Sequence, residues 1–347
     1  MKLCTKLCTT AEFKNIRCGG CSLFTASVTG TGIYTPQRIM TNQELERVVE
    51  TTADWIVSRT GIKERRIAAP EQATSDLCLE AARGALEDAG ITAADLDCII
   101  VGTITPDMVF PSTACIIQGK LGATRAAAFD ISAACTGFIY GLQLAKQGIE
   151  AGSWEHVLVI GGETMSRILD WQDRNTCVLF GDGAGAAVIS RSNGKGARIL
   201  GVHLGADGSG GDCLILPAGG SRLPASAETV AERKHYIAMN GHEVYKFAVR
   251  IVEEAAGQVL SKLGLTFADV DYLVPHQANL RIIEGFAKRL KLPVDKIAIN
   301  LDLYGNMSGA SIPVALHQFK HKLNTGDKVL LVSFGGGLTW GSCLLEW

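Results

Sequence analysis

The sequence predicts an α/β fold built from two duplicated halves, because two segments of the first half each recur in the second half. Residues 91–102 (ITAADLDCIIVG) and 265–276 (LTFADVDYLVPH) align without gaps and share a Thr, an Ala and two Asp. Residues 177–190 and 331–344 form a second repeat, and each copy has the pattern of a strand, a glycine turn and a second strand. A unit that recurs within one chain indicates duplication of a structural unit.

Helical segments precede both copies of the first repeat. Apolar residues recur with helical spacing over 77–89 in the first case and over 244–263 in the second. Together the repeats predict two α/β halves, at 28–196 and 197–347. Residues 1–27 differ from both halves, since they are rich in Thr, Cys and Lys and show no periodicity, and we expect them to be a disordered N-terminal extension.

The first half contains a reactive residue at a strand-to-helix junction. An apolar run at 126–131 (AAAFDI) ends shortly before Cys135, where a helix-like stretch begins. Backbone N–H groups at the start of a helix, and the positive end of its dipole, stabilise a thiolate over a thiol. The alternative is that Cys135 is a small buried apolar residue, as free cysteines commonly are. Two similar junctions in the second half favour the catalytic interpretation.

His276 and Asn306 occupy those two junctions. The strand expected at 270–275 runs directly into His276, and the strand expected from residue 297 leads through a glycine turn to Asn306; a helix follows each of them. Ligands of open α/β sheets bind beyond the carboxyl ends of the strands. The duplication therefore predicts a site between the halves, with a nucleophile from one half and two polar partners from the other.

The composition excludes several classes of function. The net charge is −2, so no overall basic field draws the chain to nucleic acid or to a membrane surface. No run of about 18 apolar residues predicts a membrane-spanning helix. The 11 cysteines are odd in number and mostly stand alone in apolar runs, which is typical of a reducing compartment. Cys18 and Cys21 are spaced as CxxC, but their surroundings match no common zinc motif, so we expect no metal site.

A cysteine, a histidine and an asparagine are compatible with two chemistries. In a papain-like protease the histidine is the base for the cysteine, and the asparagine orients the imidazole ring. In a Claisen condensation the cysteine carries an acyl group as a thioester, and the other two residues donate hydrogen bonds that stabilise an enolate. The Cys-Gly-Ser-Cys-Trp-like pattern of the protease is absent, and a protease would not predict a duplicated α/β unit. Condensation is therefore favoured.

Several longer strings resemble one known family. They are DWIVSRTGIKERRIAAP at 54–70, AACTGF around Cys135, FGDGAGAAV at 180–188, VPHQANLRI around His276, YGNMSGASIP around Asn306 and SFGGGLTWGS at 333–342. From about Val28 to Trp347 the chain resembles β-ketoacyl-acyl-carrier-protein synthase III, the initiating condensing enzyme of type II fatty acid synthesis.

This resemblance implies a thiolase fold with five layers, α-β-α-β-α, and a homodimer. It implies that a short acyl group passes from coenzyme A to the cysteine and is then condensed with malonyl-acyl-carrier protein, releasing carbon dioxide. The implied partners are an acyl-CoA, malonyl-acyl-carrier protein and a second copy of the chain, with no nucleic acid, no membrane and no cofactor. The expected location is cytoplasmic, with a plastid as the minor alternative.

The resemblance also implies roles for individual residues. Cys135 is the acylated nucleophile, and His276 with Asn306 is the decarboxylation pair. The backbone N–H groups of Cys135 and Gly336 form the oxyanion hole, and Phe334 crowds the malonyl carboxylate. Further implied contacts are, for coenzyme A, Trp55, Arg59, Arg174, Gly241 and Asn279; for the acyl pocket, Met165, Phe180 and Phe110, the last reaching the partner subunit; and for the carrier protein, the basic helical face of Lys246, Arg281, Lys288 and Arg289.

The sequence leaves the substrate and the pathway open. Segment 217–235 is long and rich in Pro, Gly, Ser and Ala, and we expect a loop that shapes the pocket. Met165 and Phe180 do not distinguish an acetyl primer from a branched or longer one. Related condensing enzymes that make a quinolone or a polyketide starter use the same three residues and are the alternative. A non-enzymatic carrier-binding scaffold is disfavoured, because the Cys, His and Asn are all present.

Overall fold

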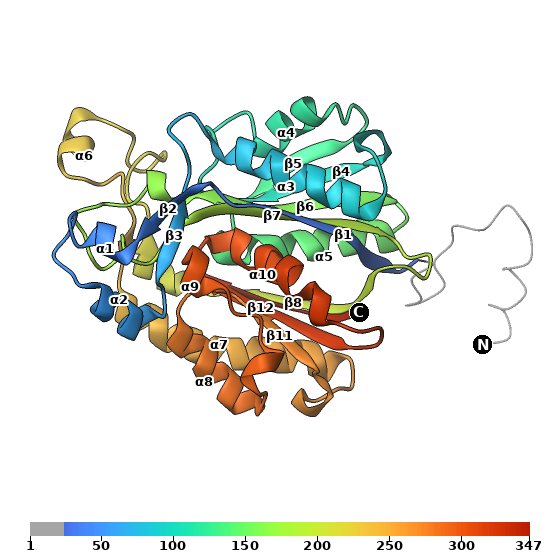
Figure 1. The fold of residues 1–347 in the computed structure, drawn as a ribbon. Coiled ribbons are helices and arrows are strands. Elements are labelled where there is room, and N and C mark those ends of the chain that lie inside the picture. Colours follow the sequence, from blue (N-terminus) through green and yellow to red (C-terminus); the bar gives the residue numbers. More distant parts are fainter. Residues whose placement is uncertain (1–23) are drawn as a thin grey trace, which may run out of the picture.

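Nine strands form the framework of residues 24–347, the part of the chain that the computed structural model describes (Figure 1). Their bounds are β1 (Ala26–Tyr34), β4 (Cys98–Gly102), β5 (Ala127–Ile131), β6 (His156–Thr164), β7 (Asp182–Arg191), β8 (Ala197–Ala206), β11 (Tyr272–Pro275), β12 (Lys328–Gly335) and β13 (Thr339–Glu346). Their spatial order is β11-β12-β13-β8-β1-β7-β6-β4-β5. The strands of the two halves therefore lie on opposite sides of the β8–β1 contact.

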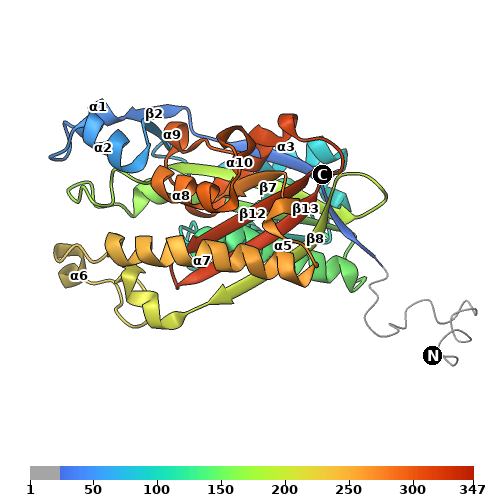
Figure 2. The same cartoon turned by 90° about the horizontal axis from the view of Figure 1, so that it is seen from below.

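Helices lie outside and between the two groups of strands. The longer ones are α3 (Thr74–Ala89), α4 (Thr113–Leu121), α5 (Gly137–Glu150), α7 (Gly241–Lys262), α8 (Leu280–Leu290) and α10 (Ser311–Phe319). α3 and α4 cover the first half, α7 and α8 cover the second, and α5 with α10 lies between them and contacts strands of both (Figure 1). Figure 2 shows α7 running across β12, β13 and β8. The expected five layers, α-β-α-β-α, are confirmed.

Smaller elements surround one end of these layers. They are the helices α1 (Asn42–Leu45), α2 (Ala53–Thr60), α6 (Ala227–Ala231) and α9 (Leu301–Tyr304), and the paired short strands β2 (Arg38–Thr41) with β3 (Glu64–Ile67) and β9 (Leu214–Ile215) with β10 (Ala238–Met239). α6 lies in the segment that was expected to be a loop throughout. Its first turn is stabilised by the Ser226 hydroxyl, which accepts from the N–H of Thr229 at 3.2 Å.

The internal duplication is visible in matching hydrogen bonds. The Asp95 carboxylate accepts from the N–H of Thr92 at 2.9 Å and from its hydroxyl at 2.7 Å. The Asp269 carboxylate accepts from the same two groups of Thr266, at 2.8 and 2.9 Å. Each pair forms a capping box at the turn before a parallel strand, β4 in one half and β11 in the other. The repeated sequence therefore adopts the same local structure twice.

The strand expected from residue 297 does not form. Ile297 makes an isolated bridge to Leu273, and the chain then enters α9. The side-chain amide of Gln277 donates to the Ala298 carbonyl at 3.0 Å and accepts from the N–H of Asn300 at 3.1 Å. These bonds replace those that a neighbouring strand would supply, so the segment is held without a ladder.

Two other boundaries differ from the sequence-based expectation. The first strand expected in 177–190 is a turn, because the buried Arg65 guanidinium donates to the Val178 carbonyl at 2.8 Å and holds the chain away from a ladder. Ala26 and Ser27, assigned to the disordered extension, are buried residues of β1. The cysteine-rich stretch before them, with Cys18 and Cys21, lies outside the described residues.

No helix in the part of the chain that the structure describes combines the length and the apolar character needed to cross a membrane. Within the same residues, His, Cys, Asp and Glu side chains do not gather in threes that could hold a metal ion.

Candidate active site

Cys135, His276 and Asn306 line one cavity of about 210 Å³. Cys135 lies in a 3-10 turn immediately before α5, His276 follows the last residue of β11, and Asn306 lies between α9 and the next helical turn. One residue comes from the first half of the chain and two come from the second. The three residues meet between the halves, at the place that the duplication predicted.

Cys135 is 7% exposed, and neighbouring backbone holds it closely. The Ser333 hydroxyl donates to the Cys135 carbonyl at 2.8 Å. A Cβ atom added to Gly335 would lie 2.8 Å from the Cys135 nitrogen, so only glycine fits there. Burial raises the pKa of Cys135 to about 12, although the neighbouring Ser308 side chain acts in the opposite direction. The thiolate expected from the sequence is therefore wrong for the resting protein, because desolvation outweighs the helix N-terminus.

His276 is an uncharged imidazole in this site. It is 3% exposed, and burial lowers its pKa to about 3. Its backbone N–H donates to the Val332 carbonyl at 2.8 Å, and its ring meets the Phe334 ring edge-on, with 5.5 Å between centroids. The buried Nδ1 atom has no hydrogen-bond partner within residues 24–347. The ring can therefore act as a neutral hydrogen-bonding group towards a molecule in the cavity.

Backbone hydrogen bonds hold Asn306 to the first half of the chain. Its N–H donates to the Leu179 carbonyl at 2.8 Å, and its carbonyl accepts from the N–H of Gly181 at 3.1 Å. Its side-chain oxygen accepts from the N–H of Ser308 at 2.8 Å. With the oxygen occupied in this way, the amide N–H groups are the ones left to face a ligand.

The glycine-rich turn after β12 completes the wall behind Cys135. Phe334 is 5% exposed and lines the 210 Å³ cavity, whereas Gly336 lines a larger adjoining cavity. Asp207 and Leu338 exchange backbone hydrogen bonds of 2.8 and 2.9 Å, which fix the far side of the turn. Both predicted supporting residues thus lie within reach of the cysteine's cavities.

The larger cavity has a volume of about 1000 Å³ and also reaches Cys135. Phe180 and Leu214 line both cavities, so they stand with Cys135 at the junction between them. Met165, one of the residues expected in the acyl pocket, is 1% exposed and lines the larger cavity. From segment 217–235, the residues that line it are Ala218, Gly219, Gly220 and His235. Part of this segment thus forms a wall of the larger cavity.

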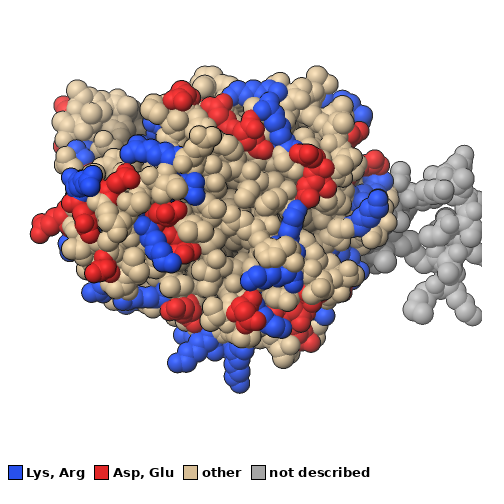
Figure 3. Space-filling model, viewed as in Figure 1, with Lys and Arg blue, Asp and Glu red and all other residues tan. Residues whose placement is uncertain are grey.

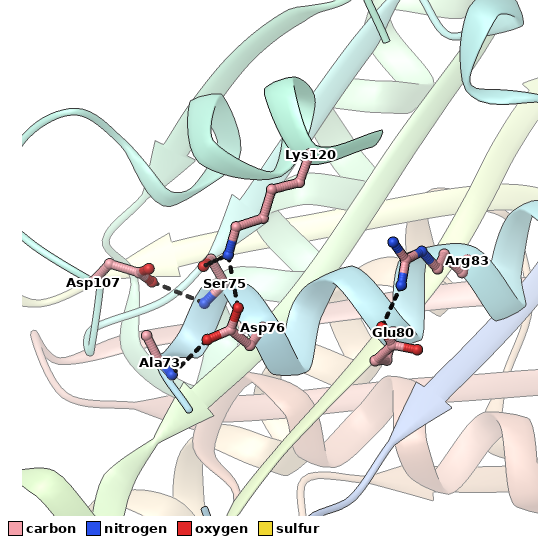
Figure 4. A network of polar contacts seen from close by, with 7 residues as sticks. All are labelled: Ala73, Ser75, Asp76, Glu80, Arg83, Asp107 and Lys120. Atoms are coloured by element: carbon pink, nitrogen blue, oxygen red, sulfur yellow. Dashed lines mark hydrogen bonds and ion pairs between the residues drawn. The ribbon is translucent and has the colours of Figure 1, made fainter. Parts of the chain in front are cut away.

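Phe110 lines neither cavity and lies in an exposed loop whose base is bonded to α3. Its exposed fraction is 83%. Figure 4 shows the base, where Asp107 accepts from the N–H of Ser75 at 2.8 Å, at the start of α3. Lys120 of α4 donates to the Ser75 hydroxyl at 3.1 Å and to Asp76 at 2.7 Å. The loop is therefore bonded to α3, which Lys120 links to α4, while its apolar tip is exposed.

Trp55 and Arg174 form a stacked pair. The Arg174 guanidinium lies over the Trp55 ring, 4.8 Å from its centroid, and donates to the Glu50 carbonyl at 3.1 Å. Arg59, on the same helix as Trp55, is exposed. Its carbonyl accepts from the Asn279 amide at 3.1 Å.

Gly241 and Asn279 both line the 210 Å³ cavity. Gly241 is the first residue of α7. Asn279 caps α8, because its side-chain oxygen accepts from the N–H of Arg281 at 2.9 Å. With the bond to the Arg59 carbonyl, this cap connects α2 to the cavity wall.

The four basic residues predicted to form one helical face come from two helices. Lys246 is on α7 and pairs with a glutamate of that helix at 3.0 Å, and Arg289 on α8 pairs with another α7 glutamate at 2.5 Å. Arg281 donates to the Ser58 carbonyl of α2 at 2.8 Å. Lys288 has no ion pair among the described residues. Figure 3 shows Lys and Arg side chains beside Asp and Glu along the edge where Figure 1 places α8, so the face is mixed in charge.

The sequence analysis missed two polar residues beside the cysteine, Glu163 and Ser308. Both are buried, and the Ser308 hydroxyl donates to the Glu163 carboxylate at 3.0 Å. Glu163 lies at the end of the apolar strand β6, and this is the same signal that identified His276. A polar residue at the end of an apolar strand could therefore have identified Glu163 from the sequence.

Comparisons with known proteins agree with this geometry. The family model of 3-oxoacyl-[acyl-carrier-protein] synthase III matches residues 129–208, and the model of the C-terminal part of that family matches residues 260–347. The β-ketoacyl-[acyl-carrier-protein] synthase III of Caldanaerobacter subterraneus is 58% identical over 329 residues, which cover 94% of this chain and 99% of that one.

Solved structures agree as well. A crystal structure of 3-oxoacyl-[acyl-carrier-protein] synthase III from Aquifex aeolicus has a TM-score of 0.85 at 45% identity, covering 93% of this chain and 100% of that chain. The priming β-ketosynthase of the R1128 polyketide pathway has a TM-score of 0.85 at 36% identity, covering 93% and 96%. The chain therefore belongs to the 3-oxoacyl-[acyl-carrier-protein] synthase III family, whose members are condensing enzymes of the acyltransferase class.

Proposed function

We propose that this chain joins a short acyl group from coenzyme A to malonyl-acyl-carrier protein by decarboxylative Claisen condensation, and so starts fatty acid synthesis. The observation that carries the proposal is the convergence of Cys135, His276 and Asn306 on one cavity between the halves. A neutral imidazole and an amide are hydrogen-bond donors for an enolate, and a buried thiol can carry an acyl group.

In the first half-reaction the Cys135 sulfur attacks the thioester carbonyl of acyl-CoA. The thiol loses its proton, and the departing thiolate of coenzyme A gains one, so the proton count balances. The backbone N–H groups of Cys135 and Gly336 stabilise the negative oxygen of the tetrahedral intermediate. The product is an acyl-cysteine and free coenzyme A.

In the second half-reaction His276 and Asn306 donate hydrogen bonds to the thioester carbonyl of the malonyl group. The carbon–carbon bond to the carboxylate breaks and carbon dioxide leaves. The electron pair of that bond stays on the remaining carbon and forms an enolate, which the two donors stabilise. The enolate carbon attacks the acyl-Cys135 carbonyl and releases the thiolate of the enzyme, which takes up a proton. Phe334 favours the first of these steps by crowding the carboxylate with an apolar ring.

We propose further contacts for the residues that the family resemblance singled out. The stacked Trp55 and Arg174 hold the adenine of coenzyme A, Arg59 binds its phosphates, and Gly241 with Asn279 lines the pantetheine tunnel. Met165 and Phe180 enclose the acyl group. Acidic groups of the carrier protein meet the basic residues of α7 and α8, which are Lys246, Arg281, Lys288 and Arg289.

We further propose that two chains form a homodimer in which Phe110 enters the acyl pocket of the partner subunit. An aromatic side chain that is 83% exposed on a fixed loop supports this arrangement. The reaction as written moves only protons and carbon–sulfur or carbon–carbon bonds, so we propose that it uses no cofactor. We propose that the protein acts in the cytoplasm, because its proposed substrates, acyl-CoA and the carrier protein, are found there.

Intact-protein mass spectrometry tests the function. The protein is incubated with acetyl-, branched and longer acyl-CoA thioesters, and then with malonyl-acyl-carrier protein. We expect one acyl adduct on Cys135, which malonyl-carrier discharges as a 3-oxoacyl-carrier product. An adduct that malonyl-CoA discharges and malonyl-carrier does not would contradict the proposal and favour a starter-unit synthase.

A further inference from the structure

Glu163 is a buried carboxylate that the proposed mechanism does not use. It has no solvent exposure and forms no ion pair within residues 24–347. The groups that donate to it are the hydroxyls of Thr103 (3.0 Å), Thr105 (2.6 Å) and Ser308 (3.0 Å) and the N–H groups of Ile104 (3.1 Å) and Thr105 (3.1 Å). Ser308 comes from the second half of the chain, and the other donors follow β4 in the first. The carboxylate therefore joins the two halves beside Cys135.

Ser308 carries this contact to Asn306. Its N–H donates to the side-chain oxygen of Asn306 at 2.8 Å. A backbone N–H can only donate, so the atom facing it must be the amide oxygen, and the NH₂ group is on the other branch. The orientation of the Asn306 amide thus depends on where the Ser308 N–H points.

The backbone of Ser308 is in a conformation that needs support. Its φ angle is +47°, in the left-handed region that residues other than glycine seldom adopt. The side chain is 1% exposed, and its hydroxyl is held by Glu163. This hydroxyl contact fixes the turn that directs the Ser308 N–H back to Asn306.

We propose that Glu163 is a positioning residue for the decarboxylation step: through Ser308 it keeps the N–H groups of the Asn306 amide directed at the substrate. Glu163 itself does not touch the substrate. The proposal rests on the role proposed above for Asn306. The ionised carboxylate accepts from every donor around it, whereas a protonated one would lose an acceptor, so the ionised form is the positioning form.

This assignment gives decarboxylation a dependence on pH. Burial raises the pKa of Glu163 to about 7, so positioning is complete above that pH and is lost below it. The titratable groups that feel the charge of Glu163 are the thiols of Cys78 on α3 and Cys135. Burial raises the pKa of both thiols, so both are neutral near pH 7. His276, with a pKa of about 3, is also uncharged there.

Two variants test the link in a Cys135→Ala background, where the thiol takes no part. Decarboxylation of malonyl-acyl-carrier protein is followed by the release of carbon dioxide. Ser308→Gly can still adopt the positive φ angle but lacks the hydroxyl that holds the turn in it, and we expect a loss of roughly 10- to 100-fold, as for a misplaced catalytic group. Glu163→Gln keeps the shape but does not titrate, and we expect the change in rate near pH 7 to disappear.

Asp182→Asn is the matched control. Asp182 is another fully buried carboxylate, held by the N–H groups of Ala68 and Ser166 and by the Ser166 hydroxyl, and its side chain forms no hydrogen bond with Ser308 or Asn306. It should change stability without changing the pH profile. A full rate in Ser308→Gly, or an unchanged pH profile in Glu163→Gln, would overturn the proposal, and if the glutamine variant does not fold, the glycine variant decides. If Asn306→Ala keeps the full rate in this background, the function proposed for Asn306 is wrong instead.

Discussion

Gly102 and Gly137 are in direct backbone contact. A Cβ atom added to Gly102 would lie 2.6 Å from the Gly137 carbonyl carbon, and one added to Gly137 would lie 2.9 Å from the Gly102 Cα. Gly102 ends β4, and Gly137 begins α5, two residues after Cys135. The contact therefore sets how closely the cysteine approaches the end of the sheet.

Gly102→Ala is expected to displace the start of α5 and slow the acylation of Cys135. The new methyl group meets backbone atoms, which cannot rotate away, so we also expect a loss of about 1–3 kcal/mol in the free energy of unfolding. Gly285→Ala is the control, because a Cβ there meets nothing within 4 Å, and alanine should stabilise α8 by about 0.5–1 kcal/mol. Rates come from acyl-CoA labelling and stabilities from urea unfolding. Wild-type acylation in Gly102→Ala would show that the contact does not position the cysteine.

The reactivity of Cys135 should follow a strongly raised pKa. Burial raises the pKa of Cys135 to about 12, so the thiolate fraction, and the rate of alkylation by iodoacetamide, should rise about tenfold per pH unit between pH 7 and 10. Among the cysteines of residues 24–347, the structure therefore favours labelling of the exposed Cys115 before Cys135 at neutral pH.

Peptide mass spectrometry separates the two sites, and Cys135→Ser identifies the active-site peptide and should not be acylated. A labelling rate that levels off near pH 7 would mean that the helix N-terminus outweighs burial after all.

Asn306→Ala should separate the two half-reactions. Cys135 should still take up an acyl group, but decarboxylation should lose about 2.7–4 kcal/mol of transition-state stabilisation, as when one oxyanion donor is removed. Asn300→Ala is the control, since Asn300 is also 7% exposed but donates to Gln318 outside the cavity. Acylation is measured by the mass of the acyl adduct, and decarboxylation by the release of carbon dioxide. The assignment fails if Asn306→Ala decarboxylates normally and cannot be acylated.

Much of the fold could be predicted because it depends on signals that are local in sequence. The repeat around Thr92 and Thr266 encodes a capping box in each half, and its copies mark equivalent strands. The strand expected from residue 297 could not be corrected in this way. The Gln277 side chain forms the hydrogen bonds to Ala298 and Asn300 that a neighbouring strand would otherwise form. This arrangement is visible only in three dimensions.

The candidate site was predictable in position but not in electrostatics. Cys135, His276 and Asn306 each follow an expected strand, and the duplication places them together. The pKa of a buried group depends on how much water the fold removes, and for Cys135 this term reverses the effect of the helix terminus. The pairing of Arg289 on α8 with Glu253 on α7 likewise depends on how the two helices pack.

His276 should make the folded protein less stable in acid. Its pKa is lowered from 6.5 to about 3 by burial, so its stabilising contribution is complete above pH 6.5 and is lost as the pH falls towards 3. Between pH 7.5 and pH 5 this amounts to about 2 kcal/mol. Glu163, with a raised pKa, acts in the opposite direction over part of this range. The comparison is therefore between wild type and His276→Gln, whose difference in the free energy of unfolding isolates the histidine.

Urea unfolding of both proteins at pH 7.5 and pH 5 measures this difference in the free energy of unfolding. We expect His276→Gln to gain stability relative to wild type as the pH falls. A constant difference would mean that folding does not lower the pKa of His276.

The last prediction concerns how the carrier protein is recognised. Lys288 has no ion pair among the described residues, whereas Arg281 is bound to the Ser58 carbonyl of α2, the helix that carries Trp55. Lys288→Glu should therefore raise KM for malonyl-acyl-carrier protein and leave priming by acyl-CoA nearly unchanged. Its effect should shrink with added salt, because the Debye length is about 8 Å at physiological ionic strength. Arg281→Glu should impair both substrates, since it also loosens α2. Equal losses for both substrates in Lys288→Glu would identify the surface as a general coenzyme A entrance, not a carrier-protein dock.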